Sequence, residues 1–206
     1  MVKKKYKSRQ KNKMPMILIA IISFVGFFVF FVAIRGLSDN TPITDNPEQQ
    51  NQRQNKEFVQ ELLPVAKQIQ EQYGLLPSIS IGQAILESDW GTSELSAKYN
   101  NLFGIKSFSP EDDFVKLKTK EFKDGKWIEV SANFKVYKNW EECMLDHAAL
   151  FAHGVDWDPY LYNGVLLADN YQTAASALQV AGYATDPTYA KKIVDVIESH
   201  KLYQYD

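Results

Sequence analysis

An uncharged, apolar stretch near the N-terminus constrains the fold of this 206-residue chain more than any other feature. No charged residue occurs from Met14 to Ile34, and residues 16–34 read MILIAIISFVGFFVFFVAI. About 20 apolar residues in a helix span the hydrocarbon core of a bilayer, and a helix that is apolar all round rarely fits a soluble core. We therefore expect residues 14–35 to form one transmembrane helix.

The charges that flank this stretch predict its orientation. Residues 1–13 carry seven basic side chains and no acidic one. The positive-inside bias then makes residues 1–13 a cytoplasmic tail and puts the rest of the chain outside the cell. A cleaved signal peptide is the alternative, but the apolar stretch is long for one and no A-x-A cleavage site follows it. We favour an uncleaved signal anchor in the cell membrane.

The remainder of the chain is acidic. From Gly36 onward, 15 basic side chains stand against all 25 acidic ones, a net charge of −10. Binding of nucleic acid needs clustered cations, so this excess argues against a nucleic-acid partner. Cys143 is the one cysteine of the chain, which excludes an intrachain disulfide, and we expect it to be buried in a helix.

Residues 36–56 are polar and rich in Asn, Gln, Asp and Pro, which is typical of a flexible stalk. A folded domain is expected from residue 57 to residue 206. In it, apolar residues recur at helical spacing from Phe58 to Tyr73, with Pro64 inside the pattern and Gly74 as a stop. A second helix is expected from Pro77 towards Glu87, ended by Trp90-Gly91, and a short one follows over residues 93–98.

The periodicity then changes to that of strands. Val115, Leu117, Thr119 and Glu121 alternate with three lysines at positions 116, 118 and 120, and Asp124-Gly125 is a strong signal for a hairpin turn. Residues 127–137 supply the return strand.

Helices are expected again in the last third of the chain. Asn139 precedes Glu142 in a capping-box pattern, residues 171–180 form another helix, and Asp186-Pro187 begins the last one. The pattern as a whole predicts an α+β domain that is mainly helical and carries a small β-hairpin lobe.

Glu87 is the first candidate for chemistry. It lies near the end of an apolar helix and close to Trp90, where loss of water disfavours the charged carboxylate. A raised pKa would make it a general acid near neutral pH. An ordinary surface glutamate is the structural alternative.

Hydrolysis of a glycoside usually needs a second carboxylate across the bond. Glu121 is the candidate because it is in phase with the apolar Val115 and Leu117, and Glu129 on the return strand is the competing choice. The three histidines, His147, His153 and His200, form no metal signature, so we expect no metal. No phosphate-binding loop is present, and we expect no cofactor.

Three blocks of sequence resemble one family. Residues 85–106 read ILESDWGTSELSAKYNNLFGIK, the hairpin contains Thr119-Lys120-Glu121, and residues 181–187 read AGYATDP. In this order, over about residues 55–205, they resemble the glucosaminidase domain of bacterial peptidoglycan hydrolases, glycoside hydrolase family 73. The resemblance implies a lysozyme-like fold.

The resemblance also implies roles for individual residues. Glu87 corresponds to the catalytic acid, Glu121 to the second carboxylate, and Tyr183 to a tyrosine near the cleaved bond. Residues that correspond to the substrate groove, or are aromatic and expected to contact sugar, are Trp90, Tyr99, Asn101, Phe103 and Tyr189.

The implied activity is cleavage of the β-1,4 bond between N-acetylglucosamine and N-acetylmuramic acid, by a membrane-anchored domain that faces the cell wall. A muramidase or lytic transglycosylase on the same fold is the close alternative. A non-catalytic wall-binding domain is the alternative of another class. Peptidoglycan glycan strands and the membrane are the expected partners.

Overall fold

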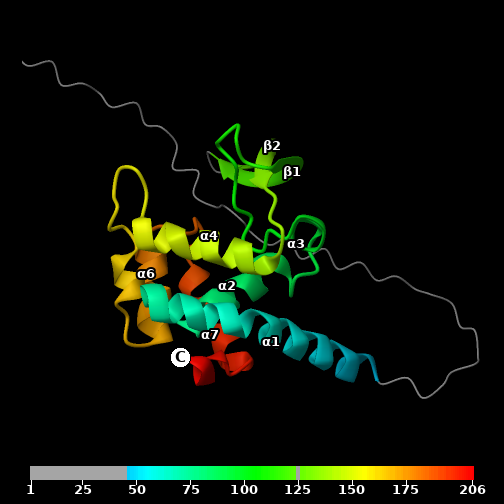
Figure 1. The fold of residues 1–206 in the computed structure, drawn as a ribbon, viewed down its shortest axis with the longest axis vertical. Coiled ribbons are helices and arrows are strands. Elements are labelled where there is room, and N and C mark those ends of the chain that lie inside the picture. Colours follow the sequence, from blue (N-terminus) through cyan, green and yellow to red (C-terminus); the bar gives the residue numbers. More distant parts are fainter. Residues whose placement is uncertain (1–45, 124–125) are drawn as a thin grey trace, which may run out of the picture.

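The computed structural model describes residues 46–123 and 126–206 (Figure 1). The predicted cytoplasmic tail, the predicted transmembrane helix, the first part of the predicted stalk and the Asp124-Gly125 turn lie outside the described residues. Among the helices of the described part, none is long and apolar enough to cross a membrane.

The described chain is mainly helical with one two-stranded antiparallel sheet, as the sequence predicts. In chain order its elements are α1 (Pro47–Tyr73), α2 (Pro77–Ser88), α3 (Glu94–Tyr99), β1 (Phe114–Lys123), β2 (Lys126–Lys135), α4 (Trp140–His153), α5 (Asn163–Leu166), α6 (Tyr171–Val180), α7 (Tyr189–Ser199) and the 3-10 helix η1 (Leu202–Tyr205).

Helix α1 begins earlier than the apolar pattern indicates. Asn46 caps it by accepting a hydrogen bond from the Glu48 backbone N–H at 3.3 Å, and Pro47 occupies the first helical turn. The prediction of a flexible stalk is therefore wrong for residues 47–56, which form the exposed first turns of α1. Local capping starts the helix there, although no apolar residue faces a core until Phe58.

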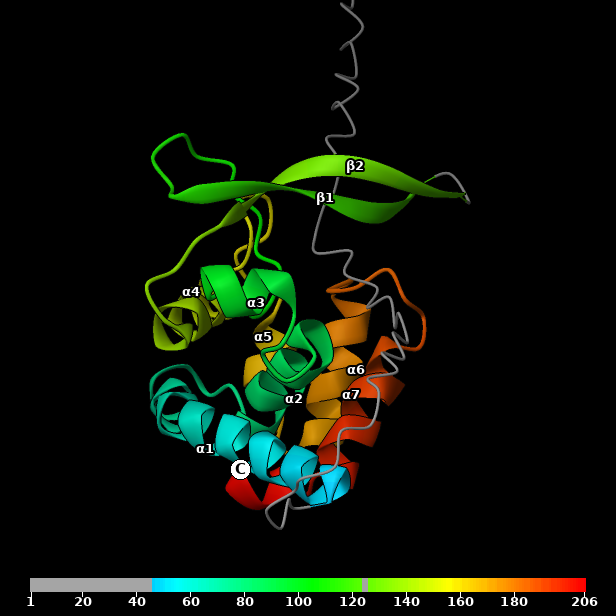
Figure 2. The same ribbon diagram turned by 90° about the vertical axis from the view of Figure 1, so that its right-hand side faces the viewer.

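Helix α2 is the buried centre of the domain. In Figure 2 it lies among the other helices, between α1 and the pair α6 and α7. Nearly every residue of α2 is buried, and the chain leaves it through two left-handed residues, Asp89 and Trp90. Gly91 follows with φ +76°, where a Cβ would lie 2.7 Å from the Trp140 ring. This tight exit sets Glu87 in the last turn of α2.

The hairpin of β1 and β2 lies across one end of the helical body (Figure 2). Val115 pairs with Phe134, whose side chain is buried, and the alternate residues of β1 from Phe114 to Lys118 are exposed. The predicted alternation is confirmed over this part of the strand. One face of the hairpin is thus half-buried and the other faces water.

The predicted cap of α4 is confirmed. The Glu142 backbone N–H donates to Asn139 Oδ1 at 2.9 Å, and the Glu142 carboxylate accepts from the Lys138 backbone N–H at 2.8 Å. Cys143, in the second turn of α4, is buried as expected, and burial raises the pKa of its thiol to about 12.

Helix α7 begins at Tyr189 with Thr188 in the cap position, so the predicted start, with Asp186 as cap and Pro187 in the first turn, is wrong. The Asp186 carboxylate accepts from the Thr188 backbone N–H at 2.8 Å and pairs with Lys192 at 2.6 Å. Mainly because of the hydrogen bond from Lys192, the pKa of Asp186 falls to about 2. Asp186 therefore orders the turn before α7 and ties it to the helix.

Candidate active site

Glu87 lies in the last turn of α2 with only 6% of its surface exposed. Burial removes water from its carboxyl group and raises its pKa to about 8, although a hydrogen bond from Tyr189 and the charge of Lys192 act in the opposite direction. The raised pKa expected from the sequence is therefore present. At neutral pH, Glu87 holds a proton that it can donate.

Tyr189, the first residue of α7, holds one oxygen of this acid. Its hydroxyl donates to Glu87 Oε1 at 2.9 Å. The side-chain amide of Gln83 donates in turn to the Tyr189 oxygen at 3.1 Å. Because Gln83 occupies an acceptor position of the Tyr189 oxygen, the hydroxyl hydrogen points towards Glu87. Oε1 then acts as an acceptor, and the acid proton resides on Oε2.

The sequence analysis missed Gln83. It lies one helical turn before Glu87 on α2, at the i, i+4 spacing that puts two side chains on the same face. A long polar side chain one turn before Glu87, on the same face of the helix, is a sequence signal that could have pointed to Gln83. Its partner Tyr189 is 106 residues away in the sequence, so the hydrogen bond between the two could not be predicted from a local pattern.

Tyr183 is fully buried behind Tyr189, and the two rings stack with their centroids 5.6 Å apart. Its hydroxyl lies 2.8 Å from His147 Nε2. Burial lowers the pKa of His147 to about 3, so this imidazole is neutral. The structure thus brings Tyr183 close to Glu87 as part of the wall behind the acid, and its predicted role at the cleaved bond stays a prediction.

Three of the five residues predicted to contact substrate are buried: Tyr189, which holds Glu87, and Phe103 and Asn101, which support the site from inside. Phe103 stacks on His147 with ring centroids 3.7 Å apart. The Asn101 amide donates to the carbonyls of Ile105 and Lys135, at 2.9 Å each, and its oxygen accepts from the Ile105 N–H. These bonds fix the segment after α3 against the base of the hairpin.

The other two predicted groove residues are half-buried. The backbone carbonyl of Tyr99 accepts from the Tyr137 N–H at 3.0 Å. The Trp90 ring packs edge-on against Phe58 of α1 and against His200, at centroid distances of 5.9 and 4.7 Å. Contact of these residues with substrate stays a prediction.

Glu121 lies near the end of β1, where its backbone pairs with Ile128, and its side chain is not among those described. Lys120 pairs with Glu129, so positions 121 and 129 are on opposite faces of the hairpin. Glu129 pairs with Lys118 at 2.8 Å on the exposed face. Position 121 belongs to the face that includes the buried Phe134, and the role of Glu121 stays a prediction.

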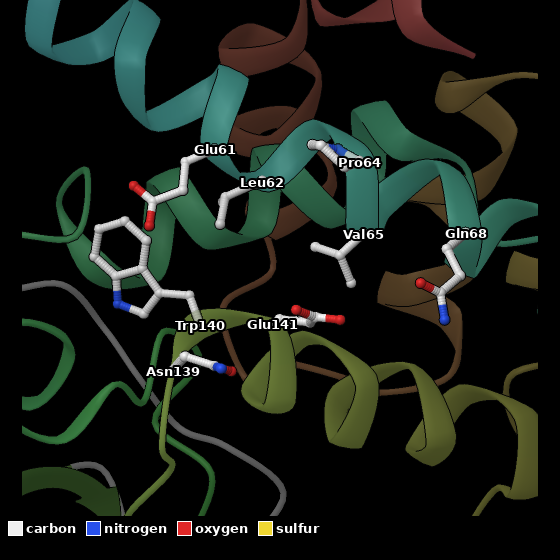
Figure 3. Close-up of a pocket in the computed structure, with 8 residues that line it drawn as sticks. All are labelled: Glu61, Leu62, Pro64, Val65, Gln68, Asn139, Trp140 and Glu141. Atoms are coloured by element: carbon white, nitrogen blue, oxygen red, sulfur yellow. The ribbon is translucent and has the colours of Figure 1, made fainter.

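Over the described part of the chain, no three His, Cys, Asp or Glu side chains lie together in a way that would hold a metal ion. A hollow of about 380 Å³ between α1 and α4 is separate from Glu87, and it includes none of the predicted site residues. Figure 3 shows Glu61 and Val65 of α1 facing Trp140 and Glu141 of α4 across it. We assign no role to this hollow.

Comparison with known proteins gives consistent matches. The sequence model of the family described as mannosyl-glycoprotein endo-beta-N-acetylglucosaminidase matches residues 63–202. Exo-glucosaminidase LytG of Bacillus subtilis (strain 168) is 42% identical over 200 residues, which cover 97% of this chain and 70% of that protein. A probable N-acetylmuramidase of Lactococcus lactis is 36% identical over 72% of this chain and 34% of its own length.

Among solved structures, the catalytic domain of the autolysin Auto from Listeria monocytogenes is similar to this fold with a TM-score of 0.68. The two are 35% identical, and the match covers 81% of this chain and 100% of that one. The similarity therefore includes the helical body and is not limited to the sequence blocks around Glu87.

Proposed function

Because this chain belongs to the mannosyl-glycoprotein endo-beta-N-acetylglucosaminidase family, we propose that it is a glycoside hydrolase that cuts the glycan strands of bacterial peptidoglycan with Glu87 as its acid. One observation carries the assignment of the acid. Glu87 is a buried carboxyl group with a pKa raised to about 8, and its Oε1 is held by Tyr189. The arrangement suits general acid catalysis at neutral pH.

The acid step follows from this geometry. Glu87 donates the proton on Oε2 to the glycosidic oxygen as the bond to the anomeric carbon breaks. The carboxylate left behind keeps the hydrogen bond from Tyr189 and the attraction of Lys192, both of which favour the charged form. The same two groups that lower the pKa of Glu87 therefore stabilise the product of proton transfer.

Glu121 is the proposed second carboxylate. Position 121 is on the half-buried face of the hairpin, whereas Glu129 is on the exposed face. Carboxyl groups about 5–5.5 Å apart act through a covalent intermediate, and groups about 6.5–9.5 Å apart leave room for a water molecule. We propose the wider, inverting separation for the enzyme without glycan. Assistance by the substrate's own acetamido group is the alternative if Glu121 proves dispensable.

The proposed bond is the one between N-acetylglucosamine and N-acetylmuramic acid. The name of the Bacillus relative, with 42% identity over most of both chains, supports it. The Lactococcus relative is named a probable N-acetylmuramidase, which supports cleavage of the neighbouring bond as the second candidate. This chain spans only about a third of that protein, so the first assignment is better supported.

We also propose that residues 14–35 anchor the domain in the cell membrane, with residues 1–13 in the cytoplasm and the domain towards the wall. The uncharged stretch and the seven basic residues before it support this arrangement.

Loss of turbidity of purified cell walls tests the enzymatic proposal. Glu87→Gln keeps the shape of the side chain but has no proton to donate, and activity should fall by about 10²–10⁴-fold. Glu94→Gln is the matched control, because the Glu94 carboxylate is exposed and pairs with Lys98 on the surface of α3. Circular dichroism should show both variants folded. Near-normal lysis by Glu87→Gln would end the proposed mechanism.

A further inference from the structure

A cavity of about 590 Å³ lies beside the C-terminal half of α4. Residues of the segment before β1 form one wall, and residues of the segment between α4 and α5 form another. In Figure 1 both segments rise on the same side of α4. The cavity shares no residue with the predicted catalytic set.

Two large aromatic side chains at this cavity are exposed to solvent. Phe108, before β1, is 81% exposed, and Trp157, after α4, is 61% exposed. Leu150, Ile105 and Val155 give the cavity further apolar surface. Nearby aromatic residues such as Phe151 are completely buried, whereas Phe108 and Trp157 do not contribute to the core. Exposed apolar surface gathered at a cavity is typical of a binding site.

Fixed polar groups surround the apolar surface. The Asp146 carboxylate accepts from Lys135 at 2.9 Å and from the Tyr137 hydroxyl at 2.6 Å. The Asp112 carboxylate accepts from the Ser107 hydroxyl at 3.0 Å. These bonds hold both carboxylates in place while leaving them lone pairs for a further donor. A ring with an apolar face and hydroxyl groups at its edge fits such a mixture.

Tyr162 is the buried residue of the cavity lining. It lines the cavity, and its buried hydroxyl has no hydrogen-bond partner within the described residues. Because the oxygen itself is buried, this unpaired hydroxyl belongs to the packing behind the cavity and is not a contact for a ligand in it.

The cavity adjoins the site of Glu87 through one layer of tyrosine rings. Tyr162 and Tyr183 have their ring centroids 6.2 Å apart, and Tyr183 stacks on Tyr189, which holds Glu87. The cavity therefore lies close to the site of Glu87, with these buried rings between them.

We propose that this cavity is a distal glycan subsite, which stacks an N-acetylated hexosamine unit of the bound strand against Trp157 and Phe108. The identity of the ligand rests on the proposed function. The C–H faces of a sugar ring pack on aromatic planes, and its hydroxyl and acetamido groups match the carboxylates and the Lys135 ammonium group at the rim. Binding here would hold the strand without taking part in cleavage.

Isothermal titration of the full-length chain carrying Glu87→Gln tests the subsite without digestion of the probe. The probe is a peptide-free hexasaccharide of N-acetylglucosamine. Adding Trp157→Ala or Phe108→Ala should raise its Kd by about tenfold, the upper range for one aromatic contact. Tyr160→Ala is the matched control, because Tyr160 is 72% exposed on the same segment but does not line the cavity. It should leave the Kd unchanged.

Three outcomes would overturn the proposal. The first is an unchanged Kd for the hexasaccharide in both aromatic variants, and the second is an equal rise in Kd in the Tyr160→Ala control. The third is that the aromatic variants bind the hexasaccharide normally but lose affinity for a free stem peptide, which would make the cavity a peptide site. Since the two side chains are exposed, the variants should keep the parent melting temperature. Failure of the proposed function is seen separately, as absence of wall digestion by the unmodified enzyme.

Discussion

At the scale of single residues, burial and hydrogen bonding act in opposite directions on Glu87. Burial raises its pKa, and Tyr189 lowers it without reversing the shift. Gln83 orients Tyr189, so the acid depends on a residue that touches no substrate atom in the proposed mechanism. The sequence predicted Glu87 because its neighbours in the chain are apolar. It did not predict Gln83, since that role depends on α2 and α7 lying side by side.

Tyr189→Phe removes the donor to Glu87 Oε1 and leaves the ring. Because that hydrogen bond lowers the pKa of Glu87, its loss should raise the pKa above about 8 and move the alkaline limb of the rate profile to higher pH. The rate at neutral pH should fall by about 10–100-fold, since the product carboxylate loses a hydrogen bond worth about 1.5–3 kcal/mol. Measurement of kcat against pH checks both effects.

A double-mutant cycle supplies the control for Tyr189→Phe. Gln83→Leu should lower kcat in the same direction, and adding it to Tyr189→Phe should cost little more if Gln83 acts through Tyr189. An alkaline limb that stays in place, or independent effects of the two substitutions, would contradict the proposed chain of hydrogen bonds.

Glu87 and His147 should together limit the pH range of stability. The folded pKa of Glu87 is raised from 4.5 to about 8, so the folded state binds the extra proton and stability falls as pH rises from 4.5 to 8. The folded pKa of His147 is lowered from 6.5 to about 3, so the unfolded state binds the extra proton and stability falls as pH drops below 6.5.

The melting temperature should therefore be highest between pH 4.5 and 6.5. Glu87→Gln should be more stable than the parent at pH 8 by a few kcal/mol, because each unit of pKa shift corresponds to about 1.4 kcal/mol. Calorimetry across this range measures the difference, with Glu94→Gln as the exposed control. A parent protein that is as stable at pH 8 as at pH 5 would show that Glu87 is not held protonated.

At the scale of helices and strands, prediction succeeded where local signals decide. The cap at Asn139, the alternation from Val115 and the stop at Gly74 are all in the structure. The start of α1 was missed because a polar capping signal, Asn46-Pro47, precedes the apolar pattern by several turns. The short helices α5 and η1 were missed because one turn carries no periodicity.

The hairpin gives a prediction at this scale. Positions 121 and 129 lie on opposite faces, so Glu121→Gln should lose most activity while Glu129→Gln loses little. The Glu129 carboxylate pairs with Lys118 on the exposed face, which makes it a matched control from the same hairpin. Wall lysis by the two variants is the measurement.

Two results would change the assignment of the second carboxylate. A dead Glu129 variant beside an active Glu121 variant would mean that the second carboxylate is Glu129. Full activity in both would favour assistance by the acetamido group of the substrate.

At the scale of the whole molecule, the order of elements and the mainly helical class were predictable, because they follow from hydrophobic periodicity along the chain. The candidate site was predictable only in part. Residues around Glu87 form one continuous block, whereas Tyr189 and His147 reach it from α7 and α4. Which aromatic residues are buried was not predictable. No local sequence pattern distinguishes Phe103, which is buried, from Trp157, which is exposed.

The proposed anchor gives a prediction for the whole chain. If residues 14–35 span the membrane with residues 1–13 inside, protease added to wall-stripped cells should remove the domain and leave a short membrane-bound fragment. An antibody to the domain and a tag at the N-terminus would follow the two pieces. Complete protection of the domain from protease would contradict the proposed topology.

The central claim is that Glu87 drives cleavage after N-acetylglucosamine in peptidoglycan, and the new ends of the digested strands test it most directly. Purified walls are digested, reduced with borohydride and analysed by mass spectrometry. We predict fragments whose reduced end is N-acetylglucosamine, released about 10²–10⁴-fold more slowly by the Glu87→Gln variant. Fragments ending in reduced or anhydro N-acetylmuramic acid would contradict the assigned bond, and release of fragments by Glu87→Gln at a rate near that of the parent would contradict the assigned acid.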